Sequence, residues 1–208
     1  MPEPFSQPPA RQIRNPERVA QDGPLALGIQ PHHLHVLMLL PLTGMCGIVV
    51  TGDAFNLYVM IEIGALAGYS LLGMGPQPRA RLATYNYLLM GMIGASFYLL
   101  GVGYLYLHTG ELNMQRIQEM LAGNAGASVA LVALVLVMLG LSLKMALVPL
   151  AGWLPNVYTY APPLAAVVTA PLVTKVMVYV MVRMILSVFG WHWVFDPLDQ
   201  CGAIFPDF

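Results

Sequence analysis

Apolar segments of membrane-spanning length constrain the fold of this chain more than any other feature of its sequence. A helix needs about 20 apolar residues to cross the hydrocarbon core of a bilayer. Because 58% of the 208 residues are hydrophobic, only 9% are charged and the mean hydropathy is +0.69, the composition is that of a membrane protein. We predict an all-α polytopic bundle with about five spans, near residues 34–50, 54–74, 82–107, 128–148 and 161–188.

The segments around these spans differ from them in composition. Residues 1–33 are rich in Pro, Arg and Gln, have no apolar core of a signal peptide, and are predicted to be disordered. Residues 111–122 place Leu, Met and Ile at helical spacing among charges, which predicts an amphipathic helix on the membrane surface. The tail 189–208 is aromatic and acidic, as is typical of a membrane interface. The membrane repeat is therefore assigned to residues 34–188.

Charge, cysteine and histidine content argues against several functions. The net charge of −1 gives no reason to expect nucleic-acid binding. Cys46 and Cys201 are far apart and have no metal or disulfide spacing, so both are interpreted as small apolar residues. His32, His33 and His35 form a candidate metal cluster, but no Cys or acidic residue is near them in sequence, and an interfacial role is favoured. No metal or cofactor is predicted.

Arginine placement predicts how the chain lies in the cell membrane. Lys and Arg collect in loops on the cytoplasmic side. The amino-terminal side carries most of the arginines, whereas Arg116 and Arg183 fall on the opposite side with most of the loop acids. The N-terminus and the loop at 75–82 are therefore predicted to be cytoplasmic, from the positions of Arg11, Arg14, Arg18, Arg79 and Arg81.

Three ionisable residues lie deep in apolar segments: Glu62, Lys144 and Lys175. A charge near the bilayer centre costs roughly 2.5–3.5 kcal/mol on insertion scales, and residues of this kind are usually functional. Counted from the segment ends, all three are near mid-depth, a placement that would allow their side chains to approach one another. One carboxylate and two amines on three helices indicate a path for protons or small cations.

The chemistry of this set depends on a contact between Glu62 and Lys144. Burial disfavours the ammonium form of a lysine, and a nearby carboxylate favours it. Making or breaking the contact would therefore switch the proton affinity of Lys144. The alternative is a structural pair that holds the helices together; Lys175 has no acidic partner visible in the sequence, which favours transport.

Local signals mark helix ends and close contacts. Pro149 and Pro155 predict a break after the fourth span, and broken helices line ion paths in transporters. Asp53 is placed to cap the second span, and Gly64 and Gly68 predict a close helix contact on it. Other polar residues are candidates for a water path, although each alone is more often packing: Ser96, Ser142, Thr169, Thr174, Tyr87 and Tyr160.

Several of these motifs resemble a known family. Residues 51–58 (TGDAFNLY) followed by Glu62 resemble the D-type subunit of Mrp-type multisubunit Na⁺/H⁺ antiporters. Further motifs are similar to the broken seventh helix and the eighth helix shared by that family and the antiporter-like subunits of respiratory complex I. They lie at 143–144, 148–150, 153–155, 161–163 and 172–176, with Tyr179.

The resemblance implies one five-helix repeat of a subunit that has two inverted repeats. In it, Glu62, Lys144 and Lys175 would serve the proton path, and the partners would be the lipid bilayer, other membrane subunits, protons and Na⁺ or K⁺. Since only one repeat matches, a fragment, a piece of a split subunit and a degenerate copy all stay open. An antiporter subunit, which is not an enzyme by itself, is favoured. The alternatives are a proton-pumping subunit of an NADH–quinone or hydrogenase-type complex and a non-conducting scaffold.

Overall fold

The computed structural model describes residues 31–75, 78–122 and 127–190, and these residues are helical, without a β-strand. The predictions for residues 1–30, for the tail 191–208 and for Cys201 fall outside them. The helices are α2 (Pro31–Val50), α3 (Ala54–Leu72), α4 (Pro78–Thr109), α5 (Met114–Leu121), α6 (Ala127–Met145), the 3₁₀ turn η2 (Leu150–Trp153), α7 (Leu154–Tyr160), α8 (Pro163–Met184) and the π-helical turn η3 (Ile185–Phe189).

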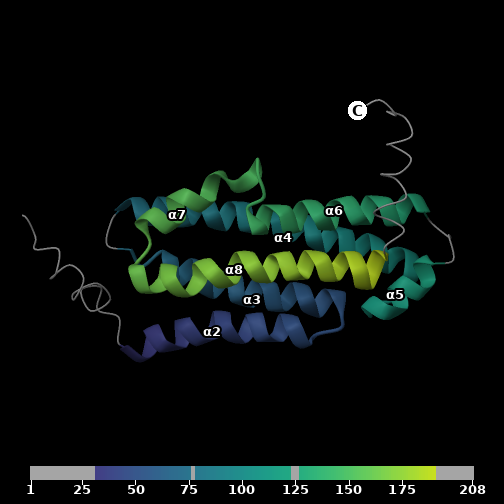
Figure 1. The fold of residues 1–208 in the computed structure, drawn as a ribbon, viewed down its shortest axis with the longest axis horizontal. Helices are drawn as coiled ribbons and strands as arrows, with labels where there is room; N and C mark the ends of the chain where they lie inside the picture. Colours follow the sequence, from purple (N-terminus) through teal and green to yellow (C-terminus); the bar gives the residue numbers. More distant parts are fainter. Residues whose placement is uncertain (1–30, 76–77, 123–126, 191–208) are drawn as a thin grey trace, which may run out of the picture.

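The long helices lie side by side as an elongated bundle, with neighbours along the chain running in opposite directions (Figure 1). Within the described residues, four segments are long and apolar enough to cross a membrane, and α2 adds a shorter apolar stretch. They are Ala54–Leu72, Arg79–Thr109, Ser128–Tyr160 and Pro163–Phe189. The predicted class, a polytopic bundle with one broken helix, is confirmed. The main difference in boundaries is at α4, which begins at Pro78 rather than near Leu82.

Side-chain and backbone caps close one end of the bundle. The Asp53 side chain accepts a hydrogen bond of 2.8 Å from the backbone N–H of Asn56, so the predicted cap of α3 is confirmed. Asn113 caps α5 in the same way. The two caps face each other: the N–H of Ala54 donates to the Leu112 carbonyl at 2.9 Å, and the N–H of Met114 donates to the Gly52 carbonyl at 3.0 Å.

Arg183, near the end of α8, ties the same turn to a third helix. Its guanidinium donates to the carbonyl oxygens of Ile48 at 2.9 Å, Val49 at 3.2 Å and Thr51 at 2.5 Å. Carbonyls at a helix C-terminus have no partner within the helix, and here an arginine more than 130 residues away in sequence satisfies them. The sequence predicted only the side of the membrane on which Arg183 lies; the structure shows in addition that Arg183 binds the carbonyls at the end of α2.

Glycines let the helix backbones approach closely. A Cβ at Gly140 of α6 would lie 2.5 Å from the Gly94 carbonyl oxygen of α4, so side chains larger than hydrogen do not fit at this crossing. A Cβ at Gly44 of α2 would similarly lie 2.9 Å from the backbone nitrogen of Gly64. The predicted contact at Gly64 is therefore present. The predicted contact at Gly68 is not, because a Cβ there would meet no atom within 4 Å.

The short helix α5 differs from its prediction in what it covers. It forms within the predicted segment, but its apolar residues Met114, Ile117 and Leu121 are at most 2% exposed, packed in the core of the bundle. They cover one end of the bundle rather than inserting into lipid. The physical reason is the pairing of the two capped turns, together with a hydrogen bond of 3.1 Å from the Gln118 side chain to the Leu186 carbonyl.

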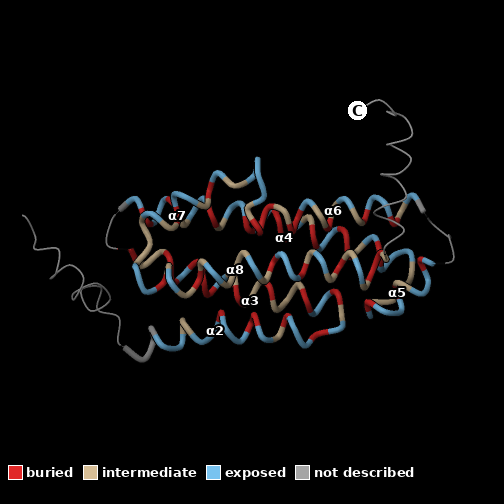
Figure 2. The backbone as a smooth tube through the Cα atoms, viewed as in Figure 1, coloured by how far each residue is buried: buried red, intermediate tan, exposed pale blue. Residues whose placement is uncertain are grey.

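The core consists of two apolar clusters, one toward each end of the bundle. Figure 2 shows the buried positions of α2 on its side toward α3, whereas much of its outer side is exposed. The cluster at the α5 end includes Met45, Ile61, Leu141 and Met177. The cluster at the α7 end includes Tyr69, Leu72, Tyr87 and Trp153. Glu62 and Lys175 lie on α3 and α8, which contribute to both clusters, whereas Lys144 lies on α6, which contributes to the cluster at the α5 end.

Candidate proton-transfer site

The break in the fourth span begins directly after Met145, where α6 ends. Pro149 follows four residues later, and a proline ring clashes with the carbonyl four positions before it in a continuous helix. Ala146 takes the left-handed conformation, with φ of 58°. The N–H of Ala146 donates to the Leu143 carbonyl at 3.3 Å, and that of Leu147 to the Ser142 carbonyl at 3.0 Å, which is the Schellman arrangement of a helix end. The predicted break is confirmed.

Lys144 lies in the last turn of α6, beside this helix end. The C-terminus of a helix carries partial negative charge, which favours a cation there. The Lys144 Nζ atom donates to the Glu62 Oε1 atom at 2.5 Å, so α6 and α3 meet in an ion pair. The two side chains are 6% and 19% exposed. A buried lysine and a largely buried glutamate therefore share one contact at an interrupted helix.

Aromatic side chains form a wall beside the ion pair. The rings of Tyr87 and Trp153 stack with centroids 4.2 Å apart, and Tyr69 meets Tyr87 edge-on at 4.5 Å. The Trp153 Nε1 atom donates to the Leu143 carbonyl at 3.3 Å, which holds η2 against the end of α6. Sequence reasoning missed Tyr69 as a site residue. Because Tyr69 is seven residues, about two helical turns, after Glu62, the spacing places both on one face of α3.

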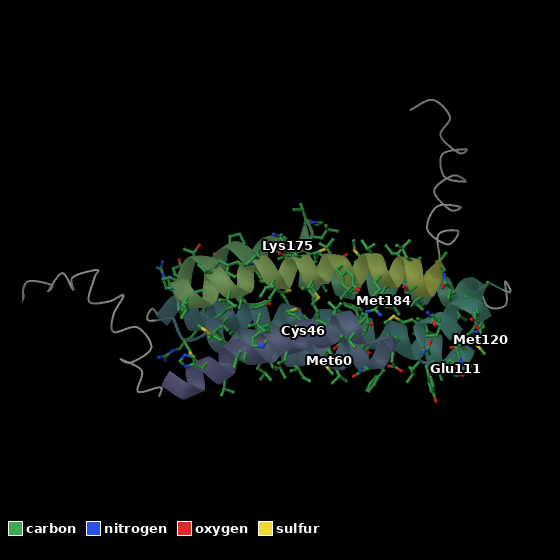
Figure 3. All side chains as sticks on the ribbon, turned by 60° about the horizontal axis from the view of Figure 1, so that its bottom comes forward. Cys46, Met60, Glu111, Met120, Lys175 and Met184 are labelled. Atoms are coloured by element: carbon green, nitrogen blue, oxygen red, sulfur yellow. The ribbon has the colours of Figure 1, made fainter. Side chains whose placement is uncertain are left out.

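Lys175 does not join the other two ionisable residues. The Lys175 residue is exposed on the surface of the bundle, and within the described residues it has no ion pair or hydrogen bond. Figure 3 shows it at the outer edge of α8. Thr169 of α8 is 2% exposed and faces the bundle. Lys175 follows six residues later, and at 100° per residue it points about 240° around the helix axis from Thr169. Of the three residues whose similar depth would allow an approach, the structure brings only Glu62 and Lys144 together, because the helical phase of α8 points Lys175 outward.

The polar residues proposed from the sequence as candidates for a water path also fall into two groups, those beside Lys144 and those that bond only within their own helix. Thr169 and Tyr87 line the interior beside Lys144. Ser96 and Thr174 donate to carbonyls four residues earlier in their own helices, as packing residues do. No group of three His, Cys, Asp or Glu side chains in the described part of the chain is arranged to hold a metal. The side chains of His32 and His33 are outside that part, so their interfacial role stays a prediction.

Lys144 and Glu62 form a buried ion pair that lies between the two apolar clusters of the bundle. The fold and this site define a class: a polytopic helical membrane protein with a buried Lys–Glu pair at a broken helix.

Comparison with known proteins gives the family. The profile described as "NADH:quinone oxidoreductase/Mrp antiporter, TM" matches residues 51–198. The chain belongs to this family, and it is an antiporter-like membrane subunit of the Mrp or complex I kind. It is 43% identical over 169 residues to the N subunit of NADH-quinone oxidoreductase from Desulforudis audaxviator, covering 80% of this chain and 34% of that relative. It is 38% identical over 161 residues to the D-type subunit of a probable K⁺/H⁺ antiporter from Rhizobium meliloti, covering 76% and 30%.

A solved structure agrees with the fold. A chain of the membrane-bound sulfane sulfur reductase, an archaeal respiratory membrane complex, superposes with a TM-score of 0.69 at 37% identity, covering 78% of this chain and 34% of that one. The chain therefore spans about a third of the length of the proteins that it matches.

Proposed function

We propose that this chain is the proton-translocating repeat of a monovalent cation/proton antiporter subunit. Lys144 is the central proton acceptor, Glu62 modulates its proton affinity, and Lys175 is the next relay. The observation that carries the proposal is the 2.5 Å contact between Lys144 and Glu62 at the interrupted end of α6. An ion pair that only held the bundle together would not need a broken helix beside it.

The Lys144–Glu62 contact supplies the switch. While the pair is closed, the carboxylate favours a proton on Lys144; when α3 and α6 move apart, that attraction weakens. Each loss of about 1.4 kcal/mol in attraction lowers the proton affinity of the amine about tenfold. Because Lys144 lies in the helical turn directly before the break, a small change in the backbone at Ala146 would be enough to move its Nζ atom.

The exposed position of Lys175 favours the presence of a partner on the outer side of α8. An ammonium facing lipid near mid-membrane costs free energy, so it is expected to face protein or a water-filled cavity. Since this chain spans about a third of the matched proteins, we propose that another membrane subunit or segment covers this face of α8 and receives the proton. The orientation that places the loop at 75–82 in the cytoplasm is part of the same proposal.

A second function is favoured by one comparison. The 43% identity to the N subunit of a quinone oxidoreductase supports a proton-pumping role in a redox-driven complex, in which the same lysine and glutamate would act. The two functions differ in what drives the protons. Flux that depends on added Na⁺ or K⁺ supports the antiporter, and flux that depends on NADH and quinone, with copurified redox subunits, supports the second function. A scaffold that conducts nothing is the remaining outcome.

The test is dissipation of ΔpH in inverted vesicles that contain this chain together with its neighbouring subunits. We expect Lys144→Ala to abolish cation-dependent dissipation, and Arg116→Ala, which removes an exposed cation of α5, to leave it unchanged. Both variants must insert at wild-type levels. Wild-type dissipation by Lys144→Ala would sink the assignment of Lys144, and no flux in any combination would favour the scaffold.

A further inference from the structure

The turn between α2 and α3 is held by a side chain from a third helix. The end of α8 lies beside this turn (Figure 1), and Arg183 of α8 donates to the carbonyl oxygens of Ile48, Val49 and Thr51. A guanidinium carries five N–H donors in a planar fork, so several acceptors bound at once fix its position closely. Within the described residues, no carboxylate oxygen lies within 4.0 Å of Arg183. The contacts of Arg183 therefore fix the place of the turn and do not neutralise an acid.

Thr51 connects Arg183 to the first turn of α3. Thr51 is 8% exposed, and its hydroxyl accepts a hydrogen bond of 2.9 Å from the Asn56 side-chain amide. Ala54, the first residue of α3, is buried, and its carbonyl accepts a hydrogen bond of 3.1 Å from the Tyr98 hydroxyl of α4. The start of α3 is therefore attached to α8 through Arg183 and Thr51, and to α4 through Tyr98.

A second polar attachment of α3 lies at Glu62. This residue is about 12 Å along the helix from Ala54, at a rise of about 1.5 Å per residue. Among the described residues, its ion pair with Lys144 is the other polar contact between α3 and a different helix. Beside this pair is a cavity of about 20 Å³ that Lys144 and Gly68 line, and a Cβ on Gly68 would meet no atom within 4 Å. The start of α3 is thus held on several sides, whereas free space adjoins its second attachment.

We propose that Arg183 is a positioning residue for Glu62. By holding the turn at Thr51, it makes the start of α3 the fixed point about which Glu62 approaches and leaves Lys144. The proposal rests on the proposed function, in which α3 and α6 move apart. Without this fixed point α3 shifts as a whole, and the carboxylate no longer returns to the same place beside the amine. Arg183 forms no hydrogen bond or ion pair with Glu62, so it acts through the placement of the helix.

The first test is cation-dependent proton flux in the vesicles with neighbouring subunits. We expect Arg183→Met to lower the flux at least about tenfold, since a misplacement of about 1 Å can cost as much as a hundredfold in rate. Arg183→Lys keeps the charge but not the planar fork, and it should recover part of the flux. The matched control is Arg116→Met, which removes an exposed cation from α5 at the same end of the bundle and should leave the flux unchanged.

A double variant separates positioning from general damage. In a Glu62→Gln background, Arg183→Met should not lower the remaining flux further, because its effect passes through the Glu62 carboxylate. A purely structural role of Arg183 predicts that the two losses multiply. Multiplying losses would therefore overturn the inference.

Infrared spectroscopy of the purified chain in detergent reports on Glu62 without relying on flux. The spectrum of each variant minus that of its Glu62→Gln counterpart isolates the carboxyl stretch of Glu62, and Lys144→Met supplies the signal of Glu62 without its partner. We expect Arg183→Met to shift the Glu62 signal toward that of Lys144→Met, Arg183→Lys to shift it less, and Arg116→Met to leave it at the wild-type position.

A wild-type Glu62 signal in Arg183→Met overturns the inference, even where flux falls. If Arg183→Met does not insert, Thr51→Val tests the same link, because it removes the hydroxyl that accepts from Asn56. Its Glu62 signal should shift in the same direction, and an unchanged signal there also overturns the inference. Failure of the proposed function is a separate result: wild-type flux in Lys144→Ala removes Lys144 from the proton path, whereas the infrared signal still decides whether Arg183 positions Glu62.

Discussion

Lys144 and Lys175 are the same residue type at similar predicted depth, yet the fold treats them differently. Lys144 is 6% exposed, lies at a helix end, and is paired with Glu62. Lys175 lies within the regular helix α8, is exposed, and has no charged partner in the described part of the chain. The charge of Lys144 is thus paired inside the bundle, whereas that of Lys175 lies on its outer surface. The difference shows that two lysines at similar predicted depth can have opposite surroundings.

The largest expected difference between the two lysines is in stability. Lys144→Met leaves Glu62 in an apolar interior without its partner, and breaking a buried pair in this way costs about 3–5 kcal/mol. Lys175→Met changes an exposed position, so the free energy of unfolding should stay within about 0.5 kcal/mol. Denaturant unfolding of the purified chain in detergent measures both.

The matched control for this comparison is the double variant Lys144→Met with Glu62→Gln. Removing both charges is expected to recover part of the loss, because no unpaired ion is then left in the interior. Equal losses for Lys144→Met and Lys175→Met would contradict the contrast between the two sites.

A smaller effect is expected from the helix crossing that positions Lys144. Gly140→Ala forces its Cβ against the Gly94 carbonyl oxygen, so α4 and α6 must separate one turn before Lys144. Overpacking of this kind costs about 1–3 kcal/mol, and the shift should also lower proton flux. Gly103→Ala, with open space around its Cβ, should leave stability unchanged or raise it by up to about 1 kcal/mol. If both variants unfold like the wild type, close approach of α4 and α6 does not matter for the site.

The smallest perturbation tests exposure alone. In a background with Cys46 and Cys201 changed to Ser, Lys175→Cys should react rapidly with a maleimide in the isolated chain, and Lys144→Cys should react slowly. When the neighbouring subunits are present, labelling of Lys175→Cys should fall several-fold because a partner covers α8. Labelling that is equally fast with and without those subunits would argue against a partner at this face, while leaving the Lys144 site untouched.

Local signals in the sequence were enough for much of the fold. Apolar length predicted the spans, Asp53 predicted the start of α3, and Pro149 predicted the break, because each effect acts within a few residues. The helix at 111–122 was also visible as a pattern. What it covers was not, since an apolar face packs equally well against lipid or against protein.

The candidate site was only partly predictable for the same reason. The cost of charge in an apolar segment identified Glu62, Lys144 and Lys175 one residue at a time. Their relative positions depend on the helical phase and crossing of three helices, which no short stretch of sequence specifies. Tertiary structure therefore decided that Glu62 meets Lys144, that Lys175 faces outward, and that Gly68 opens onto a cavity.

By itself, the sequence determined a membrane bundle, its break and the three charges within its apolar segments, because hydrophobic length, proline geometry and the cost of charge in an apolar segment are local effects. Only the tertiary structure decided which charges are paired and which hydroxyls surround Lys144, because contacts between helices are set by close packing of side chains that are distant along the chain.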